Sequence, residues 1–276
     1  MESFDAVVVG AGPAGLTAAT YLARFRRRVL VLADGRSRAR WIPESHNTPG
    51  FPDGVGGPEF LRRLTEQAAQ FGVEVRPLRA DRLGTADRGF EIAVAGGEPL
   101  RARTVLLATG VVDRLPDLPG LQAAIRASLV RMCPICDAYE AIGKRIAVLG
   151  DGGLANREAA FLRDYSDDVT VIGERAGDLR FTDGTVLWTG PAEPARTFDH
   201  LYLALGCQPQ SDLAVACGAR LDDDGNLTTD AHQMTSIDGL YAAGDVVRGL
   251  NQIAVAAGEA AIAATAIHNR LRSTER

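Results

Sequence analysis

The feature that most constrains the fold of this chain is a strand, a glycine-rich turn and a helix that occur twice in the sequence. In the first copy, apolar residues 4–9 lead into Gly10-Ala11-Gly12-Pro13-Ala14-Gly15, and an apolar helix is expected over residues 16–25. A second hydrophobic strand follows at 28–33 and ends beside Asp34, 24 residues after Gly10. This order is typical of dinucleotide binding, because the glycines let the backbone approach a pyrophosphate and the acid accepts a ribose hydroxyl. The helix N-terminus adds unpaired N–H groups for the phosphates.

The second copy repeats this order in fewer residues. Residues 145–149 lead into Gly150-Asp151-Gly152-Gly153-Leu154-Ala155, and Glu174 lies 24 residues after Gly150, just past the next strand. Each copy closes with a strand that ends in glycine, 100 residues after the first glycine of the turn in copy one and 56 in copy two. The shorter copy must have lost strands or a helix. Two interpretations stay open for it: a working nicotinamide site, or a trimmed scaffold that positions the segment before it.

A third glycine cluster lies near the end of the sequence. Residues 240–246 indicate a strand that ends in Gly244-Asp245, and an Ala-rich helix is expected from about Gln252. Taken alone, this helix is most simply a closely packed core helix. Because two nucleotide motifs precede it, this helix is also a candidate for the segment that closes over a flavin. Asp245 would then bind a ribityl hydroxyl, and the helix N-terminus would stabilise negative charge on a reduced flavin ring.

Charge and hydropathy exclude several classes of protein. The 30 basic and 35 acidic side chains give a net charge of −5, which argues against nucleic-acid or anionic-membrane binding. The longest stretch of small apolar residues, 253–267, contains Glu259 and is shorter than the ~20 residues of a membrane span. The first strand begins near Phe4, which leaves no room for a signal peptide, and four cysteines do not make a disulfide scaffold. We therefore expect a soluble, cytoplasmic, globular protein.

A close cysteine pair carries the expected chemistry. Cys133 and Cys136 are separated by Pro-Ile, are followed by Asp137, and lie just before the second glycine turn. A zinc site would need two more ligands, usually a second close pair, and Cys207 and Cys217 are ten residues apart. A redox-active dithiol is favoured over zinc or buried structural thiols, because this spacing closes a small disulfide and a helix beginning there lowers a thiol pKa. Asp137 is placed to carry a proton for a leaving thiolate, or is an ordinary acid of a first helical turn.

The order of these motifs resembles the low-molecular-weight thioredoxin reductases over nearly the whole chain. The sequence also matches that family at 47–52, 57–59, 108–110, 235–236 and 244–246, and Asn251-Gln252-Ile253 stands where the family has Arg-Gln-Ala. The resemblance implies an α/β fold of two Rossmann-like domains, FAD- and NAD(P)-binding, the second inserted into the first. We expect the FAD domain at 1–115 and 204–276, and a shortened NAD(P)-binding domain at 116–203.

The resemblance also implies a cofactor, partners and residue roles. It implies FAD, a homodimer, and a thioredoxin-like protein or a small-molecule disulfide or dithiol as partner. Cys136 would face the flavin, Cys133 would attack the partner disulfide, and Asp137 would be the acid–base group. The FAD-binding residues are expected to be Gly10, Gly12, Pro13, Ala14, Gly15, Asp34, Asn47, Thr109, Gly110, Gly244, Asp245, Gln252 and Ile253, and the NAD(P)-binding residues Gly150, Gly152, Ala155, Glu174 and Arg175.

Two segments depart from the family pattern. Residues 35–43 replace a Gly-Gly-Gln-Leu stretch at one edge of the flavin pocket. Glu174-Arg175, with Arg180 further on, replaces a His-Arg-Arg cluster, and a carboxylate there would repel a 2′-phosphate, so NADH is favoured over NADPH. Three alternatives therefore remain beside a thioredoxin reductase: a ferredoxin-linked reductase, a dithiol oxidase that passes electrons to oxygen, and a flavin-bound redox sensor without turnover.

Overall fold

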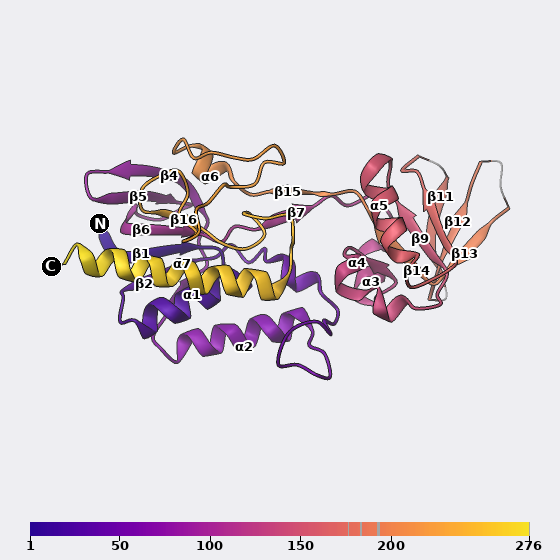
Figure 1. Ribbon diagram of the computed structural model, residues 1–276, viewed down its shortest axis with the longest axis horizontal. Helices are drawn as coiled ribbons and strands as arrows, with labels where there is room; N and C mark the ends of the chain where they lie inside the picture. The colour runs from indigo at the N-terminus through magenta and orange to yellow at the C-terminus, as the bar shows by residue number, and fades with distance from the viewer. Residues whose placement is uncertain (176, 183, 192–193, 276) are drawn as a thin grey trace. The chain divides into compact units, whose positions relative to one another are not determined.

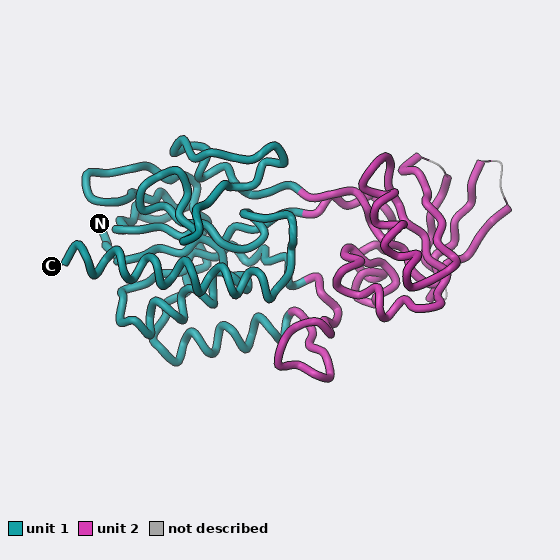
Figure 2. Tube along the Cα trace, in the orientation of Figure 1, with its two compact units in different colours: residues 1–40, 58–112, 208–276 teal, residues 41–57, 113–207 magenta. Residues whose placement is uncertain are grey.

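A computed structural model describes residues 1–175, 177–182, 184–191 and 194–275, and the chain forms two compact units. The first unit comprises Met1–Arg40, Pro58–Val112 and Gln208–Arg276, and the second comprises Trp41–Gly57 and Asp113–Cys207 (Figure 2). Each unit contains a mainly parallel sheet with helices, which confirms the predicted α/β class.

The sheet of the first unit has seven strands in the order β3-β2-β1-β6-β5-β4, with β16 also paired to β6. The strands are β1 (Glu2–Val9), β2 (Val29–Leu32), β3 (Glu74–Arg76), β4 (Ala80–Ala86), β5 (Gly89–Val94), β6 (Leu100–Leu107) and β16 (Leu240–Ala242). The pairs among β3, β2, β1, β6 and β16 are parallel, whereas β4, β5 and β6 form an antiparallel meander. The last four residues of β1 and all four of β2 are apolar and buried, as expected of parallel strands covered on both faces.

Helices α1 and α7 of this unit lie side by side (Figure 1). Small residues on both helices are buried, including Ala18 and Ala19 of α1 and Ala260 and Ala263 of α7, and small side chains allow two helices to approach closely. The helices of the first unit are α1 (Pro13–Arg24), η1 (Arg38–Trp41, a 3₁₀ turn), α2 (Gly57–Ala69), α6 (Asp212–Val215) and α7 (Ile253–Ser273). The expected C-terminal helix therefore begins where its sequence indicates, one residue after Gln252.

The second unit has a four-stranded parallel sheet in the order β10-β9-β14-β8 and a three-stranded antiparallel sheet in the order β11-β12-β13. Its elements are α3 (Leu121–Arg126), β8 (Val130–Arg131), α4 (Pro134–Asp137), η2 (Tyr139–Ala141), β9 (Ile146–Leu149), α5 (Gly152–Leu162), β10 (Val169–Ile172), β11 (Asp178–Thr182), β12 (Thr185–Thr189), β13 (Arg196–Phe198) and β14 (His200–Leu203). Five residues separate β10 from β11, too few for the crossover helix and further parallel strand that follow β2 in the first unit. The chain passes between the units through β7 (Val111–Asp113) and β15 (Cys207–Pro209), which pair with each other.

The expected domain boundaries stay a prediction. Residues 41–57, expected in the FAD domain, make contacts that group this segment with the second unit. The physical reason is at its first residue, since Trp41 packs against the apolar core of the second unit together with Leu118 and Met132.

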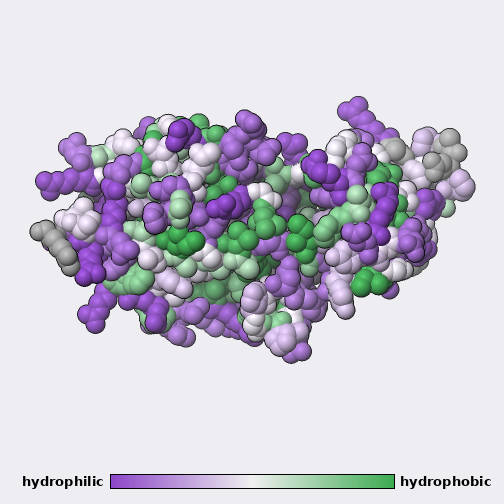
Figure 3. Space-filling model, in the orientation of Figure 1, coloured by the Kyte–Doolittle hydropathy of each residue, from purple (hydrophilic) through white to green (hydrophobic). Residues whose placement is uncertain are grey.

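Hydrophilic residues are in the majority on the face of the molecule shown in Figure 3, with hydrophobic residues interspersed among them. Within the described residues, no helix combines the length and the apolar character needed to cross a membrane.

Candidate functional site

The first glycine turn joins β1 to α1 and its glycines are required by the backbone. Gly10 has a φ of 110°, and a β-carbon there would overlap the carbonyl oxygen of Ala108. A β-carbon on Gly15 would overlap the carbonyl oxygen of Gly10. At Gly12, the N-cap of α1, a β-carbon would meet only the Ser37 hydroxyl, at 3.4 Å. Glycines therefore keep the start of α1 free of side chains of its own, as a turn that holds a pyrophosphate requires.

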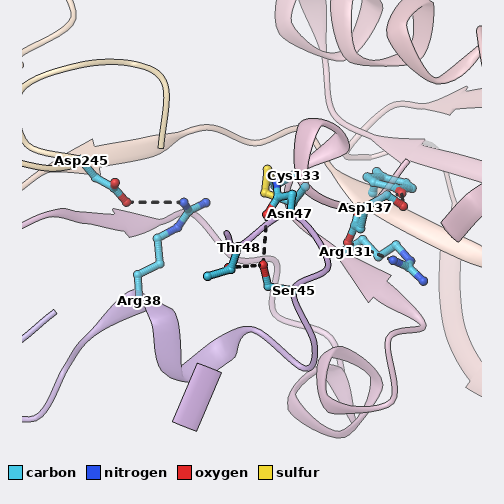
Figure 4. Close-up of a disulfide and its surroundings, with 10 residues drawn as sticks. Arg38, Ser45, Asn47, Thr48, Arg131, Cys133, Asp137 and Asp245 are labelled. Atoms are coloured by element: carbon cyan, nitrogen blue, oxygen red, sulfur yellow. Dashed lines mark hydrogen bonds and ion pairs between the residues drawn. A yellow bond between two sulfur atoms is a disulfide. The ribbon is translucent and has the colours of Figure 1, made fainter. Parts of the chain in front are cut away.

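Two carboxylates expected to bind cofactor hydroxyls are each held by an arginine. Asp34 follows β2 and accepts hydrogen bonds from the backbone N–H of Arg36 at 3.1 Å and from its Nε at 2.7 Å. Partial burial raises the pKa of Asp34, but the bonds from Arg36 outweigh it and the net shift is downward. Asp245 lies 3.7 Å from Arg38 (Figure 4). Both arginines come from the 35–43 segment that departs from the family pattern, so this segment changes the charge beside both acids.

The third glycine cluster is fixed by a buried carboxylate. Glu259 of α7 is 5% exposed, accepts a 2.8 Å hydrogen bond from the backbone N–H of Gly244, and also pairs with Arg248. A β-carbon on Gly244 would lie 3.0 Å from the β-carbon of Ala14. The turn before Asp245 thus lies against the start of α1, as a site shared by the two motifs requires.

The remaining expected FAD residues fall into two groups. Thr109 donates a 2.6 Å hydrogen bond to the carbonyl of Gln210, whose N–H bonds to Gly110, while Gln252 and Ile253 begin α7. Asn47 lies instead in the second unit, where its side chain contacts the Ser45 hydroxyl at 3.0 Å, a contact drawn in Figure 4.

The second glycine turn resembles the first at its first glycine and differs at its second, because Gly152 has a positive φ whereas Gly12 has a φ of −82°. Gly150 has a φ of 155°, and a β-carbon there would lie 2.5 Å from the carbonyl oxygen of Ala204. Gly152 has a φ of 73°, and a β-carbon there would meet no atom within 4 Å. Ala155 is fully buried where helix and sheet meet. The backbone therefore leaves room for a pyrophosphate here as well.

The charges around the second turn are mixed. Asp151 is the N-cap of α5 and accepts a 3.4 Å hydrogen bond from the backbone N–H of Glu174. The guanidinium of Arg157 lies over Gly153, since a β-carbon on that glycine would be 3.2 Å from Nη1. Two carboxylates at this edge disfavour a further phosphate, while Arg157 and the exposed Arg175 favour one.

The cysteine pair forms a disulfide at the start of α4 (Figure 4). Cys133 is the N-cap of this single-turn helix, and its carbonyl accepts a 2.9 Å hydrogen bond from the N–H of Cys136. A pocket of about 360 Å³ opens beside the pair. It is lined by His46, Asn47, Pro134, Ile135, Cys136, Asp137, Ala138, Tyr139, Glu140 and Tyr165, all from the second unit.

Asp137 is held at both carboxylate oxygens. The Tyr202 hydroxyl donates to Oδ1 at 2.9 Å, and Nη1 of Arg131 lies 3.0 Å from Oδ2. Burial raises the pKa of Asp137, against the lowering effects of Arg131 and Tyr202. Asp137 is therefore a partly buried acid beside a disulfide cysteine, with a pKa moved toward the neutral range where a proton donor works best.

Five side chains at these sites were missed by motif reasoning: Arg38, Arg131, Arg157, Tyr202 and Glu259. Arg131 had a weak signal, its position two residues before Cys133. Tyr202 had none, since it lies 65 residues from Asp137 and its role depends on strand pairing.

The comparisons agree on one family. The family model described as pyridine nucleotide-disulphide oxidoreductase matches residues 4–188 and 180–260. A thioredoxin reductase of Peptoclostridium acidaminophilum is 31% identical over 95% of each chain. A bifunctional thioredoxin reductase/thioredoxin of Mycobacterium leprae is 32% identical over 94% of this chain, which spans 64% of that longer protein. The crystal structure of thioredoxin reductase from Streptococcus pyogenes superposes with a TM-score of 0.89, at 25% identity, over 98% of this chain and 99% of that one.

Proposed function

The chain belongs to the pyridine nucleotide-disulphide oxidoreductase family and is a flavoprotein disulfide oxidoreductase, and we propose that it reduces the disulfide of a thioredoxin-like protein. One observation carries the proposal: the Cys133–Cys136 disulfide shares a pocket with Asp137, an acid whose pKa is raised by burial. A disulfide that served only as a structural clamp would not need such an acid beside it.

The exchange begins from the reduced cysteine pair. The thiolate of Cys133 attacks one sulfur of the partner disulfide, so that a mixed disulfide forms and the first partner sulfur leaves as a thiolate. Cys136 then attacks Cys133, which restores the enzyme disulfide and releases the second partner sulfur. Asp137 donates a proton to a leaving thiolate and recovers one when the pair is next reduced. The net reaction converts one enzyme dithiol and one partner disulfide into an enzyme disulfide and a partner dithiol.

FAD, when bound, supplies the two-electron exchange that the protein side chains cannot provide. In the first unit, the turn Gly10–Gly15 would hold its pyrophosphate, because that turn fits without a side chain in the way. Asp34 and Asp245 would accept cofactor hydroxyls in place of their contacts with Arg36 and Arg38. Thr109, Gly110, Gly244, Gln252 and Ile253 would line the same site, and Asn47 is a further expected contact of the cofactor.

A nicotinamide is the proposed electron donor, with NADH favoured over NADPH. Gly150, Gly152 and Ala155 would hold the pyrophosphate, with Arg157 beside it. Glu174 and Asp151 put negative charge where a 2′-phosphate would need positive charge, and Arg175 offsets it only in part. Ferredoxin is the alternative donor, supported by the missing crossover helix of the second unit. A homodimer in the cytoplasm completes the proposal, on the resemblance to the family.

A dithiol oxidase is the second candidate function. It is supported by the pocket of about 360 Å³ beside Cys136, a volume suited to a small molecule rather than to a protein surface. In that case the pair would accept electrons from a small dithiol and oxygen would be the final acceptor. Oxygen consumption with a dithiol and without nicotinamide would distinguish this candidate from a reductase.

The first test is an anaerobic titration of the flavin-loaded protein with NADH and with NADPH, followed by flavin absorbance. Bleaching by NADH at lower concentration than by NADPH supports the proposal. Bleaching by neither, together with full reduction by a dithiol, would favour the oxidase.

Cys136→Ser tests the role of the pair. We expect this variant to bind FAD and to pass at least about 100-fold fewer electrons to a thioredoxin disulfide, because the dithiol is lost. Cys217→Ser is the matched control, since Cys217 lies in the first unit and its thiol contacts the carbonyl of Leu83. Normal turnover by Cys136→Ser would refute the assignment.

A further inference from the structure

Arg131 and Tyr202 reach Asp137 from adjacent strands. In the parallel pairing of β8 with β14, Tyr202 is the register partner of Arg131. Register partners project to the same face of a sheet, about 5 Å apart. Both side chains therefore arrive together at the last residue of α4, where one binds Oδ1 and the other Oδ2.

The two contacts fix the carboxyl group rather than merely touch it. Bonds at both oxygens, from donors on two strands, define the plane of the carboxyl group and leave it one orientation. The Tyr202 side chain is fully buried, and the same hydroxyl also lies 3.2 Å from the backbone carbonyl of Asp137. Asp137 cannot turn without breaking a bond to a group that has no room to follow it.

Arg131 depends on Asp137 in return. Its side chain is 11% exposed, and its Nε is buried without a hydrogen-bond partner in the described part of the chain. A buried guanidinium is costly unless a carboxylate compensates it, and Asp137 supplies that carboxylate. The other charged or titratable groups near this pair are Glu140 from η2 and His200 from β14; His46, Tyr139 and Tyr165 line the pocket.

We propose that Arg131 and Tyr202 are positioning residues that hold the Asp137 carboxyl group beside the Cys133–Cys136 pair and set the pH at which it gives up its proton. This inference rests on the proposed disulfide exchange, in which Asp137 is the proton donor.

The sign of the pH effect follows from the contacts. Arg131 and the Tyr202 hydroxyl both stabilise the ionised carboxylate, whereas burial and Glu140 oppose ionisation. Removing either positioning residue therefore raises the pKa of Asp137 further. Disulfide reduction needs protonated Asp137 and slows as pH rises through this pKa, so the alkaline limb of the rate profile must move to higher pH.

The test uses the flavin-loaded protein and the variants Tyr202→Phe, Arg131→Met and Arg131→Lys. Asp137 is titrated by ¹³C NMR of aspartate-labelled protein, with Asp137→Asn identifying its resonance. We expect the midpoint to rise by about one pH unit in Tyr202→Phe and in Arg131→Met, and Arg131→Lys to keep most of the wild-type value. The alkaline limb of disulfide reduction, with the alkyl disulfide 2-hydroxyethyl disulfide as the substrate, should shift by the same amount.

Tyr241→Phe is the matched control, because Tyr241 is a buried tyrosine of the first unit. It should leave the Asp137 midpoint unchanged. Variants that bind FAD but keep the wild-type midpoint would overturn the proposal, and Tyr202→Phe and Arg131→Lys preserve this test if Arg131→Met does not fold. A wild-type protein that reduces no disulfide would instead refute the proposed function, whatever the titration shows.

Discussion

The two glycine turns of this protein begin alike at their first glycine and then differ, since φ is −82° at Gly12 and 73° at Gly152. Gly10 and Gly150 each have a positive φ, and in each a β-carbon would collide with the carbonyl that follows the neighbouring parallel strand. After the turn, the first unit continues through α2 and β3, whereas the second goes from β10 straight into an antiparallel sheet. Local steric contacts thus fix the first glycine of each turn. This geometry is kept in the second unit, although β10 there leads directly into the antiparallel strand β11.

The charged side chains near the two turns also differ. In the first unit, Asp34 and Asp245 are each paired with an arginine. In the second, Asp151 and Glu174 lie together at the N-terminus of α5. Charged side chains in and beside a glycine turn, as well as its backbone, therefore favour or disfavour a phosphate there.

The largest expected effect comes from Gly10→Val set against Gly150→Val. The side chain at Gly10 would collide with Ala108 at the centre of the first sheet, so we expect loss of more than about 3 kcal/mol of stability and of bound FAD. At Gly150 the collision with Ala204 damages the second unit, and FAD should remain bound at close to one per chain. Flavin absorbance per polypeptide and thermal unfolding measure both effects. Equal loss of FAD in both variants would show that the units do not bind cofactor independently.

A smaller effect is expected at Glu259, which has no counterpart in the motif of the second unit. Glu259→Ala leaves the Gly244 N–H without its acceptor, which should cost about 2–3 kcal/mol and weaken FAD binding. Glu259→Gln is the matched control, since its carbonyl oxygen can still accept that bond. Urea unfolding and the amount of retained FAD measure these effects. Equal stability and equal FAD binding in Glu259→Ala and Glu259→Gln would contradict the proposed role of this hydrogen bond.

The smallest effect is a pH dependence confined to the second unit. Burial raises the pKa of Glu158 to about 7, against an opposing effect of Arg157. A raised carboxyl pKa stabilises the fold fully below about pH 4.5, and this stability is lost as pH rises to about 7. Because Glu158 is partly exposed, the loss should be about 1–2 kcal/mol.

The difference in unfolding free energy between wild type and Glu158→Gln isolates this group from other titrations, including that of His200, whose pKa burial lowers to about 4. The difference should fall between about pH 4.5 and 7 and be flat on either side. The matched control is Glu66→Gln, an exposed glutamate on α2, for which we expect a change within about 0.5 kcal/mol. A flat difference for Glu158→Gln would contradict the burial argument.

Features of this protein that depend on local chemistry could be predicted from the sequence. The α/β class, the family and the disulfide between Cys133 and Cys136 are confirmed, because glycine turns and close cysteine pairs leave their mark within a few residues. Helix starts were less accurate: the helix expected over residues 16–25 begins at Pro13, since the turn itself forms its first residues. The roles of the individual cofactor residues stay predictions.

The sequence motifs do not predict which segments of the chain pack together in one unit. The sequence around Trp41 contains no signal of the core against which it packs, so the grouping of 41–57 with the second unit leaves no motif to read. Arg38 and Asp245 are 207 residues apart, so their ion pair was equally invisible.

By itself, the sequence determined two glycine turns, a disulfide and an acid beside it, because each depends on backbone sterics or on neighbours within a few positions. The tertiary structure decided what holds that acid. Asp137 meets Arg131 and Tyr202 through the register of two parallel strands whose pairing brings together residues 71 positions apart. Contacts of this kind are set by the packing of a whole sheet, and no local pattern of residues encodes them.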